Sequence, residues 1–194
     1  MIERHSIHKN FTFSERELLR YLKTVNKFSK IEEEILATIT FKHAYQKLVI
    51  RSGLFISFPF KEGSETELGK YPTVASEKVG WFIKEFIEEN SPVDSILVNQ
   101  RHIKPTFQKP LQIKLFGNFD ENKPAELDLV KFLHKYSTYA PTDTSLVILT
   151  DSSLKVDTKD ATAWLKENKF PFSEVVLVGN KETRKRNDYR VLKP

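Results

Sequence analysis

The alternation of helical and strand periodicities from residue 75 onward restricts the fold more than any other feature of the sequence. Apolar residues recur at helical spacing in three segments, and four shorter segments have the period or continuous apolar character of strands. Their order is helix 75–90, strand 94–100, strand 111–117, helix 124–139, strand 144–150, helix 158–170 and strand 173–179. Strands that alternate with helices in this way favour parallel pairing. We therefore expect an α/β core with a central mixed sheet flanked by helices.

The first 70 residues have a different pattern. A helix is predicted over 14–28, because Ser14 and Glu17 form a capping box before apolar residues at helical spacing. Strand periods follow at 34–42, 46–51 and 54–60, although a helix continuing from Ile31 is an alternative for the first of them.

The polar segment 61–73 contains two of the six glycines and is typical of a linker or loop. It divides the chain into an N-terminal α+β extension, residues 1–70, and an α/β core with a basic C-terminal tail, residues 71–194.

Composition excludes several classes of site. The chain has 194 residues and no cysteine, so disulfides, thiolate catalysis and cysteine-ligated zinc are excluded. None of the five histidines forms a metal-binding pair at helical spacing, and no phosphate-binding or nucleophile-elbow glycine motif is present. No apolar run is long enough to cross a membrane and no signal peptide is evident, so an intracellular, cytoplasmic location is expected.

Residues 110–117, PLQIKLFG, contain the candidate site. Leu111, Ile113 and Leu115 alternate as one apolar face, while Gln112 and Lys114 share the other. If the preceding strand forms a hairpin with this one, Asp94 approaches the pair. A carboxylate, an amide oxygen and an ammonium together suit metal-assisted phosphodiester hydrolysis. The alternative is a half-buried strand whose polar pair faces water.

The runs PVDSILV and KPLQIKLFG, preceded by helix 75–90, resemble the PD-(D/E)XK nuclease superfamily of restriction endonucleases and repair nucleases. The family motif is an acidic residue on one strand, followed on the next strand by Asp or Glu, any residue, and Lys. The resemblance implies a restriction-endonuclease-like core of order α-β-β-β-α-β. It covers roughly residues 75–180, and one core strand is not evident in the sequence.

By position, the resemblance makes Asp94 and Gln112 ligands of Mg²⁺ or Mn²⁺, with the backbone carbonyl of Ile113 as a further ligand. Lys114 would be the catalytic lysine. Many members also carry a glutamate on the preceding helix, for which Glu77 is the nearest candidate, although its helical phase is poor. Gln112 departs from the motif, because it replaces an anionic ligand with a neutral one.

These observations leave three functions open, of which the last is a structural subunit of a larger complex with no nucleic-acid role. The first is a metal-dependent DNA nuclease, with RNA as an alternative substrate. The second is a catalytically inactive nuclease-fold module that binds nucleic acid or assembles a complex. The net charge of +5 is concentrated in residues 181–194, and a homodimer is compatible with the family. The residues expected to meet phosphates are Arg101, Lys104, Lys109, Arg184, Lys185 and Arg186.

Overall fold

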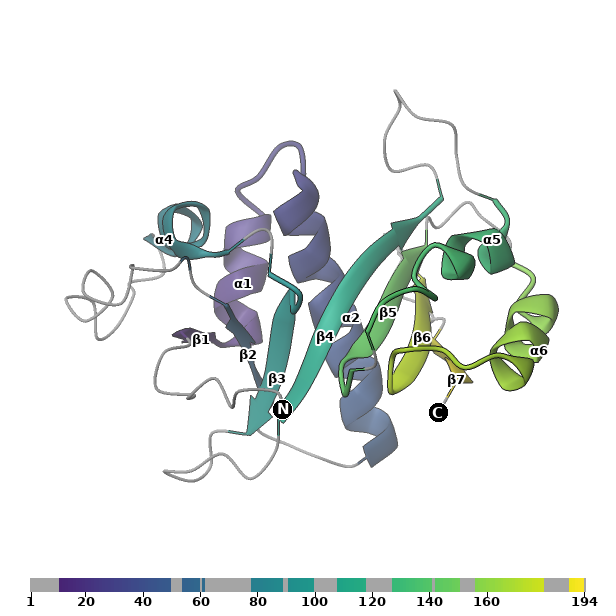
Figure 1. The fold of residues 1–194 in the computed structure, drawn as a ribbon. Coiled ribbons are helices and arrows are strands. Elements are labelled where there is room, and N and C mark those ends of the chain that lie inside the picture. The colour runs from purple at the N-terminus through teal and green to yellow at the C-terminus, as the bar shows by residue number, and fades with distance from the viewer. Residues whose placement is uncertain are drawn as a thin grey trace.

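The protein is an α/β structure built on one mixed sheet (Figure 1). The computed structural model describes residues 11–49, 54–59, 61, 78–88, 91–99, 108–117, 127–140, 142–150, 156–179 and 189–193. Seven strands in these ranges lie in the order of the sequence: β1 (Phe11–Phe13), β2 (Leu54–Phe58), β3 (Ser95–Asn99), β4 (Gln108–Phe116), β5 (Ser145–Thr150), β6 (Glu174–Gly179) and β7 (Tyr189–Lys193). β4, β5 and β6 are parallel to one another, and every other neighbouring pair is antiparallel.

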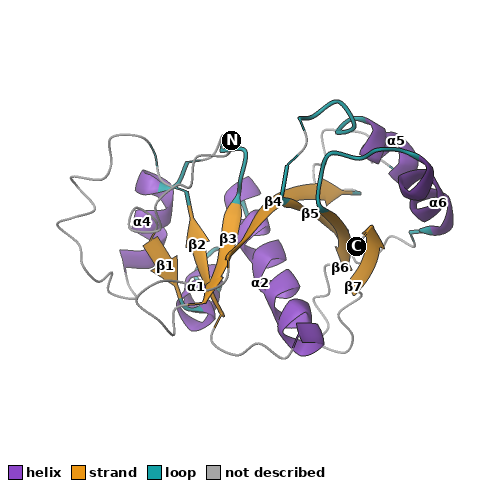
Figure 2. Ribbon diagram, turned by 60° about the horizontal axis from the view of Figure 1, so that its bottom comes forward, coloured by secondary structure: helices purple, strands orange, loops and turns teal. Residues whose placement is uncertain are grey.

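Helices cover both faces of the sheet (Figure 2). The described helices are α1 (Glu15–Leu22), α2 (Lys30–Val49), α4 (Val79–Phe86), α5 (Leu129–His134) and α6 (Lys159–Glu167). One buried cluster joins α1, α2 and α4 to one face, and a second joins α5 and α6 to the other. Successive side chains of β4 point to opposite faces of the sheet, so β4 contributes to both clusters. Leu111 and Ile113 belong to the first cluster and Phe116 to the second.

β4 joins two different halves of the sheet. Its first residues pair antiparallel with β3, and the last of these pairs is Leu111 with Ser95. Residues 111–116 pair in parallel with β5. β4 therefore continues beyond the beginning of β3, and among the described residues only one edge of its second half is paired in the sheet (Figure 1).

The strand predicted over 34–42 is wrong, as is the one over 46–51 as far as Val49, because both segments lie in α2. The β-branched residues misled the prediction, yet Thr38 and Thr40 satisfy their hydroxyls within the helix by donating to the carbonyls four residues earlier. Buried residues lie on several sides of α2, so it lacks a clear amphipathic stripe.

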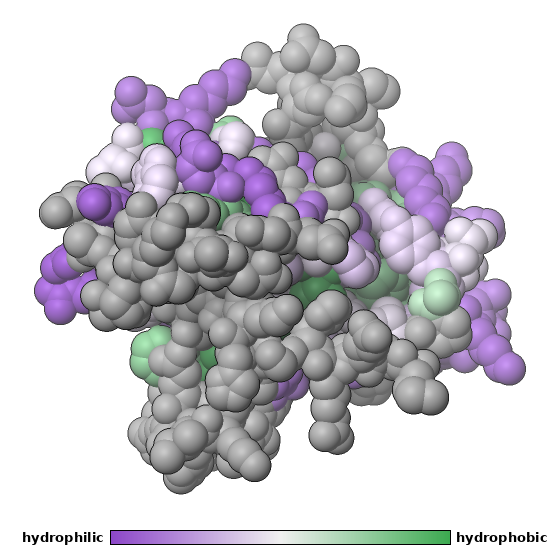
Figure 3. Space-filling model, turned by 60° about the vertical axis from the view of Figure 1, so that its left-hand side comes forward, coloured by the Kyte–Doolittle hydropathy of each residue, from purple (hydrophilic) through white to green (hydrophobic). Residues whose placement is uncertain are grey.

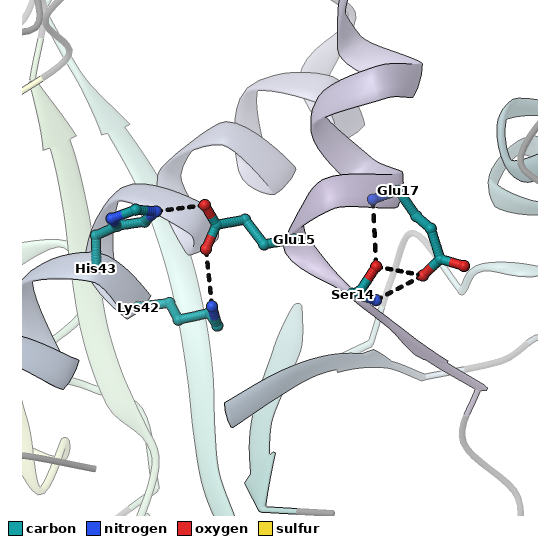
Figure 4. A network of polar contacts seen from close by, with 5 residues as sticks. All are labelled: Ser14, Glu15, Glu17, Lys42 and His43. Atoms are coloured by element: carbon teal, nitrogen blue, oxygen red, sulfur yellow. Dashed lines mark hydrogen bonds and ion pairs between the residues drawn. The ribbon is translucent and has the colours of Figure 1, made fainter. Parts of the chain in front are cut away.

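A partly exposed polar contact joins α1 to α2 (Figure 4). Ser14 caps α1 in a capping box with Glu17, as the sequence predicted. The adjacent Glu15 accepts from Lys42 Nζ at 2.8 Å and contacts His43 Nε2. Burial acts to raise the pKa of Glu15, but Lys42 and His43 hold it below its ordinary value. α2 is thereby fixed at its middle, between α1 and the sheet.

The other predicted elements are confirmed in type, with ends that shift by a few residues. The expected helix 14–28 ends at Leu22, and the expected helix 124–139 is described as α5 over Leu129–His134. The segments on the two sides of residue 70 share one sheet, because β2 pairs with β3, and they share one buried cluster. None of the described helices has the length and apolarity needed to span a membrane.

The exposed large apolar side chains among the described residues come from separate parts of the chain. They are Leu19, Trp81, Leu127, Tyr139 and Val191. On the face drawn in Figure 3, the described hydrophobic side chains are likewise visible as separate small areas. This distribution gives no reason to assign a docking surface there.

Candidate active site

The candidate site lies at the first residues of β3, next to the part of β4 that extends past the end of its pairing with β3. Asp94, immediately before β3, donates its backbone N–H to the carbonyl of Leu111 at 2.9 Å. Its carboxylate oxygen Oδ2 accepts from the backbone N–H of Ile113. The Asp94 carboxylate thus accepts a hydrogen bond that a backbone carbonyl would have accepted had β3 begun earlier in the chain.

The two polar residues of β4 lie on the side of the sheet that faces α5. Alternation places Gln112 and Lys114 with Phe116, which packs against Phe132 of α5. Gln112 is 7% exposed. The Nζ atom of Lys114 lies 5.9 Å from the ring centroid of Tyr136, just after α5. The expectation that this pair shares one face is therefore met by the structure.

The backbone of Ile113 has a defined direction. The N–H and C=O groups of one strand residue point to the same edge of the strand. Since the N–H of Ile113 points to Asp94, its carbonyl also points toward the side where β3 is missing. This is the placement that the resemblance requires of a backbone metal ligand.

A second carboxylate, Glu34, reaches the site from α2. Its side chain is 12% exposed, and its Oε1 atom forms an ion pair with Lys30 Nζ at 3.4 Å. This Oε1 atom is buried and has no hydrogen-bond partner among the described residues. One turn later, Thr38 forms a 2.9 Å hydrogen bond with Ser95, which holds this part of α2 against the first residue of β3.

The pKa values of both carboxyl groups are raised. Burial and the neighbouring Asp94 raise the pKa of Glu34 from 4.5 to about 7, against the smaller effects of Lys30 and Lys114. Burial also raises the pKa of Asp94, although the N–H of Ile113 and the charge of Lys114 act in the opposite direction. The same two lysines act on both carboxylates. The charges of Glu34, Asp94, Lys30 and Lys114 therefore belong to one site.

The oxygens at this site fit a small divalent cation. Mg²⁺ prefers carboxylate, amide and carbonyl oxygens. Glu34, Asp94, Gln112 and the carbonyl of Ile113 supply such oxygens, and the buried Oε1 of Glu34, which lies 3.4 Å from the ammonium of Lys30, is an acceptor that a metal ion would also satisfy. The described residues contain no group of three or more His, Cys, Asp or Glu side chains able to hold a metal. A complete ligand set here therefore depends on Gln112 and on the backbone.

The structure brings together four of the residues predicted from sequence: Asp94, Gln112, Ile113 and Lys114. Most of the others lie outside the described residues, namely Glu77, Arg101, Lys104, Arg184, Lys185 and Arg186. Lys109 is described at the beginning of β4. Its ammonium forms a 2.7 Å ion pair with Glu174 and lies 5.1 Å from the ring centroid of Tyr45. A phosphate would have to compete with these contacts.

Glu34 was missed because residues 34–42 were interpreted as a strand, and Lys30 was missed because the residues just before them were assigned to no element. The signal that marks the helix is Ser29-x-x-Glu32, a second capping-box pattern. In the structure, the backbone N–H and hydroxyl of Ser29 both donate to Glu32, just before the first turn of α2. With the helix recognised, Glu34 would have become a candidate for the glutamate that the resemblance places on a helix.

Comparison of the chain with protein-family models, curated proteins and solved structures finds no match.

Proposed function

We propose that this protein is a metal-dependent nuclease of the PD-(D/E)XK kind that hydrolyses phosphodiester bonds in DNA. The observation that carries the proposal is the convergence of Glu34 and Asp94 beside Gln112 and Lys114. Two partly buried carboxylates with raised pKa values are costly to a fold, and such groups are concentrated at functional sites.

The order of elements supports the proposal. The series α2, β2, β3, β4, α5, β5 has the α-β-β-β-α-β order of the family core, with α4 added between β2 and β3. In this arrangement α2, not residues 75–90, is the first helix of the core. Its glutamate, Glu34, takes the role that the sequence had offered to Glu77.

Each residue has a distinct role in the proposed reaction. Glu34, Asp94, Gln112 and the carbonyl of Ile113 would hold the cation. Bound Mg²⁺ would acidify a water molecule and offset the charge that develops on the phosphate. Lys114 would donate hydrogen bonds to the attacking water or to a phosphate oxygen, stabilising the transition state more than the bound substrate. Lys30, 68% exposed beside Glu34, is placed to meet a neighbouring phosphate.

The neutral Gln112 favours a second candidate function, a nuclease-fold module that binds nucleic acid without cutting it. A Gln ligand gives the site one negative charge fewer than the family motif, so the site attracts a cation less strongly. The two candidates differ in one respect. Cleavage needs the metal ion, whereas phosphate contacts alone depend on salt and persist in a chelator.

The test is cleavage by the purified full chain of supercoiled, branched and single-stranded DNA, and of RNA, with Mg²⁺ or with a chelator. We expect cleavage of DNA in Mg²⁺, none in chelator, and loss of cleavage in Asp94→Asn. Lys131→Gln, a change at a 77% exposed residue of α5, is the matched control and should cut like wild type. DNA binding in chelator without cleavage under any condition would favour the binding module, and cleavage of RNA alone would correct the substrate.

A further inference from the structure

The ammonium of Lys114 lies between two carboxylates and an aromatic ring. The charges of Glu34 and Asp94 act on it from the side of α2 and β3. On the side of α5, its Nζ atom lies over the ring of Tyr136 at 5.9 Å from the centroid. A cation at this distance from an aromatic face is attracted by the ring quadrupole.

Tyr136 is anchored by other rings. Phe116 of β4 contacts Phe132 of α5 at 5.1 Å between ring centroids, and Phe132 contacts Tyr136 at 5.3 Å. Beyond Tyr136 the series continues to Tyr139 at 5.6 Å, and from Tyr139 to Phe172 at 6.0 Å. The backbone N–H of Tyr136 donates to the carbonyl of Leu133 at 2.9 Å. The ring therefore has a fixed place within a series of contacting rings that runs from the buried Phe116 to the buried Phe172.

We infer that Tyr136 is a positioning residue, whose ring face holds the Lys114 ammonium in place for the proposed hydrolysis. The inference rests on the proposed function for its catalytic consequence, but the contact itself can be tested without it. Nothing in the sequence pattern pointed to Tyr136, because it is 22 residues away from Lys114 along the chain.

The contact between the Tyr136 ring and the Lys114 ammonium would restrict a flexible side chain that the proposed reaction needs in one place. Lysine has a long flexible side chain and loses much rotamer freedom when it is fixed. Two nearby carboxylates would draw its ammonium toward the oxygens that a cation needs. Attraction by the ring acts from the other side and keeps the ammonium out of the ligand set. Burial and the neighbouring Tyr139 raise the pKa of Tyr136, so its ring stays neutral over the working pH range.

The kinetic test compares Tyr136→Leu with Tyr136→Phe in the full chain. The cation–π attraction is worth a factor of about three to thirty. We expect kcat to fall by that factor in the Leu variant with KM for DNA unchanged, and most of kcat to return in the Phe variant, which keeps the ring. Replacement by pentafluorophenylalanine, similar in shape but with a reversed quadrupole, should behave like Leu. A Leu or pentafluoro variant that cuts as fast as the Phe variant would overturn the inference.

The structural test uses nuclear magnetic resonance on metal-free protein. An aromatic face shifts the ε-methylene protons of a lysine above it upfield. We expect a shifted Lys114 signal, assigned by its disappearance in Lys114→Gln, in wild type and Tyr136→Phe but not in Tyr136→Leu. An unshifted Lys114 in wild type would refute the positioning role while leaving the nuclease proposal intact. Absence of cleavage by wild type would refute the nuclease proposal while leaving this contact measurable.

Discussion

Replacing Glu34 with Gln is expected to make the metal-free protein more stable at pH 8 and to abolish its metal-dependent cleavage. In the folded protein the pKa of Glu34 is about 7, against 4.5 for an ordinary glutamate. At 1.36 kcal/mol per pKa unit, keeping this carboxylate charged costs the fold roughly 3 kcal/mol. Glutamine has the same shape without the charge, so the variant avoids most of this cost.

The pH dependence of this effect has a defined sign. Because the folded protein holds the Glu34 proton more tightly than the unfolded chain does, wild-type stability falls as the pH rises from about 4.5 to about 7 and then stays level. The advantage of Glu34→Gln in the free energy of unfolding should therefore be near zero below pH 4.5 and roughly 1–3 kcal/mol at pH 8. Urea unfolding at a series of pH values measures it.

Mg²⁺ should reverse this order of stability. A cation that binds the folded state stabilises it by mass action, so Mg²⁺ should stabilise wild type at pH 8 and leave Glu34→Gln nearly unchanged. Cleavage should fall by about a hundredfold or more in the variant. Glu85→Gln, an exposed glutamate of α4, is the matched control for both measurements. A Glu34→Gln variant that is less stable at pH 8 and still cuts would remove Glu34 from the site.

Replacing Lys114 with Met is expected to lower the cleavage rate about a hundred- to a thousandfold, because one charged donor to the transition state is lost. Methionine keeps an unbranched stem that can pack over Tyr136. Metal binding should not weaken, since the ammonium is not a ligand and its removal takes one positive charge away from the carboxylates. Single-turnover cleavage and a metal titration of the same preparation measure the two effects.

Lys131→Met is the control for this prediction, because Lys131 is an exposed lysine on the nearby helix α5. It should leave both the cleavage rate and metal binding unchanged. Equal rates for Lys114→Met and wild type would show that Lys114 does not take part in the reaction, whatever the metal does.

Sequence reasoning located one half of the candidate site because that half is local. Gln112 and Lys114 share a face through the two-residue period of a strand, which the sequence displays directly. Asp94 could be added because consecutive strands so often form antiparallel pairs, and β3 and β4 do so. To predict these three residues, it was enough to recognise the two strands and to assume that they pair with each other.

The other half depends on tertiary structure. Glu34 belongs to a helix whose β-branched residues favour a strand locally, and burial on several sides removes the periodicity that usually identifies a helix. Even with α2 recognised, it is the packing of the helix on the sheet, including the contact of Thr38 with Ser95, that brings Glu34 to the beginning of β3. Tyr136 reaches Lys114 through ring packing that has no counterpart in sequence spacing.

Binding of Mn²⁺, followed by electron paramagnetic resonance, tests most directly whether Glu34 and Asp94 serve one ion. We predict one Mn²⁺ per wild-type chain at pH 8, displaced by Mg²⁺, with affinity reduced about tenfold or more in both Glu34→Gln and Asp94→Asn and unchanged in Glu85→Gln. Failure of wild type to bind Mn²⁺, or equal binding by wild type and both site variants, would contradict a shared metal site at the beginning of β3.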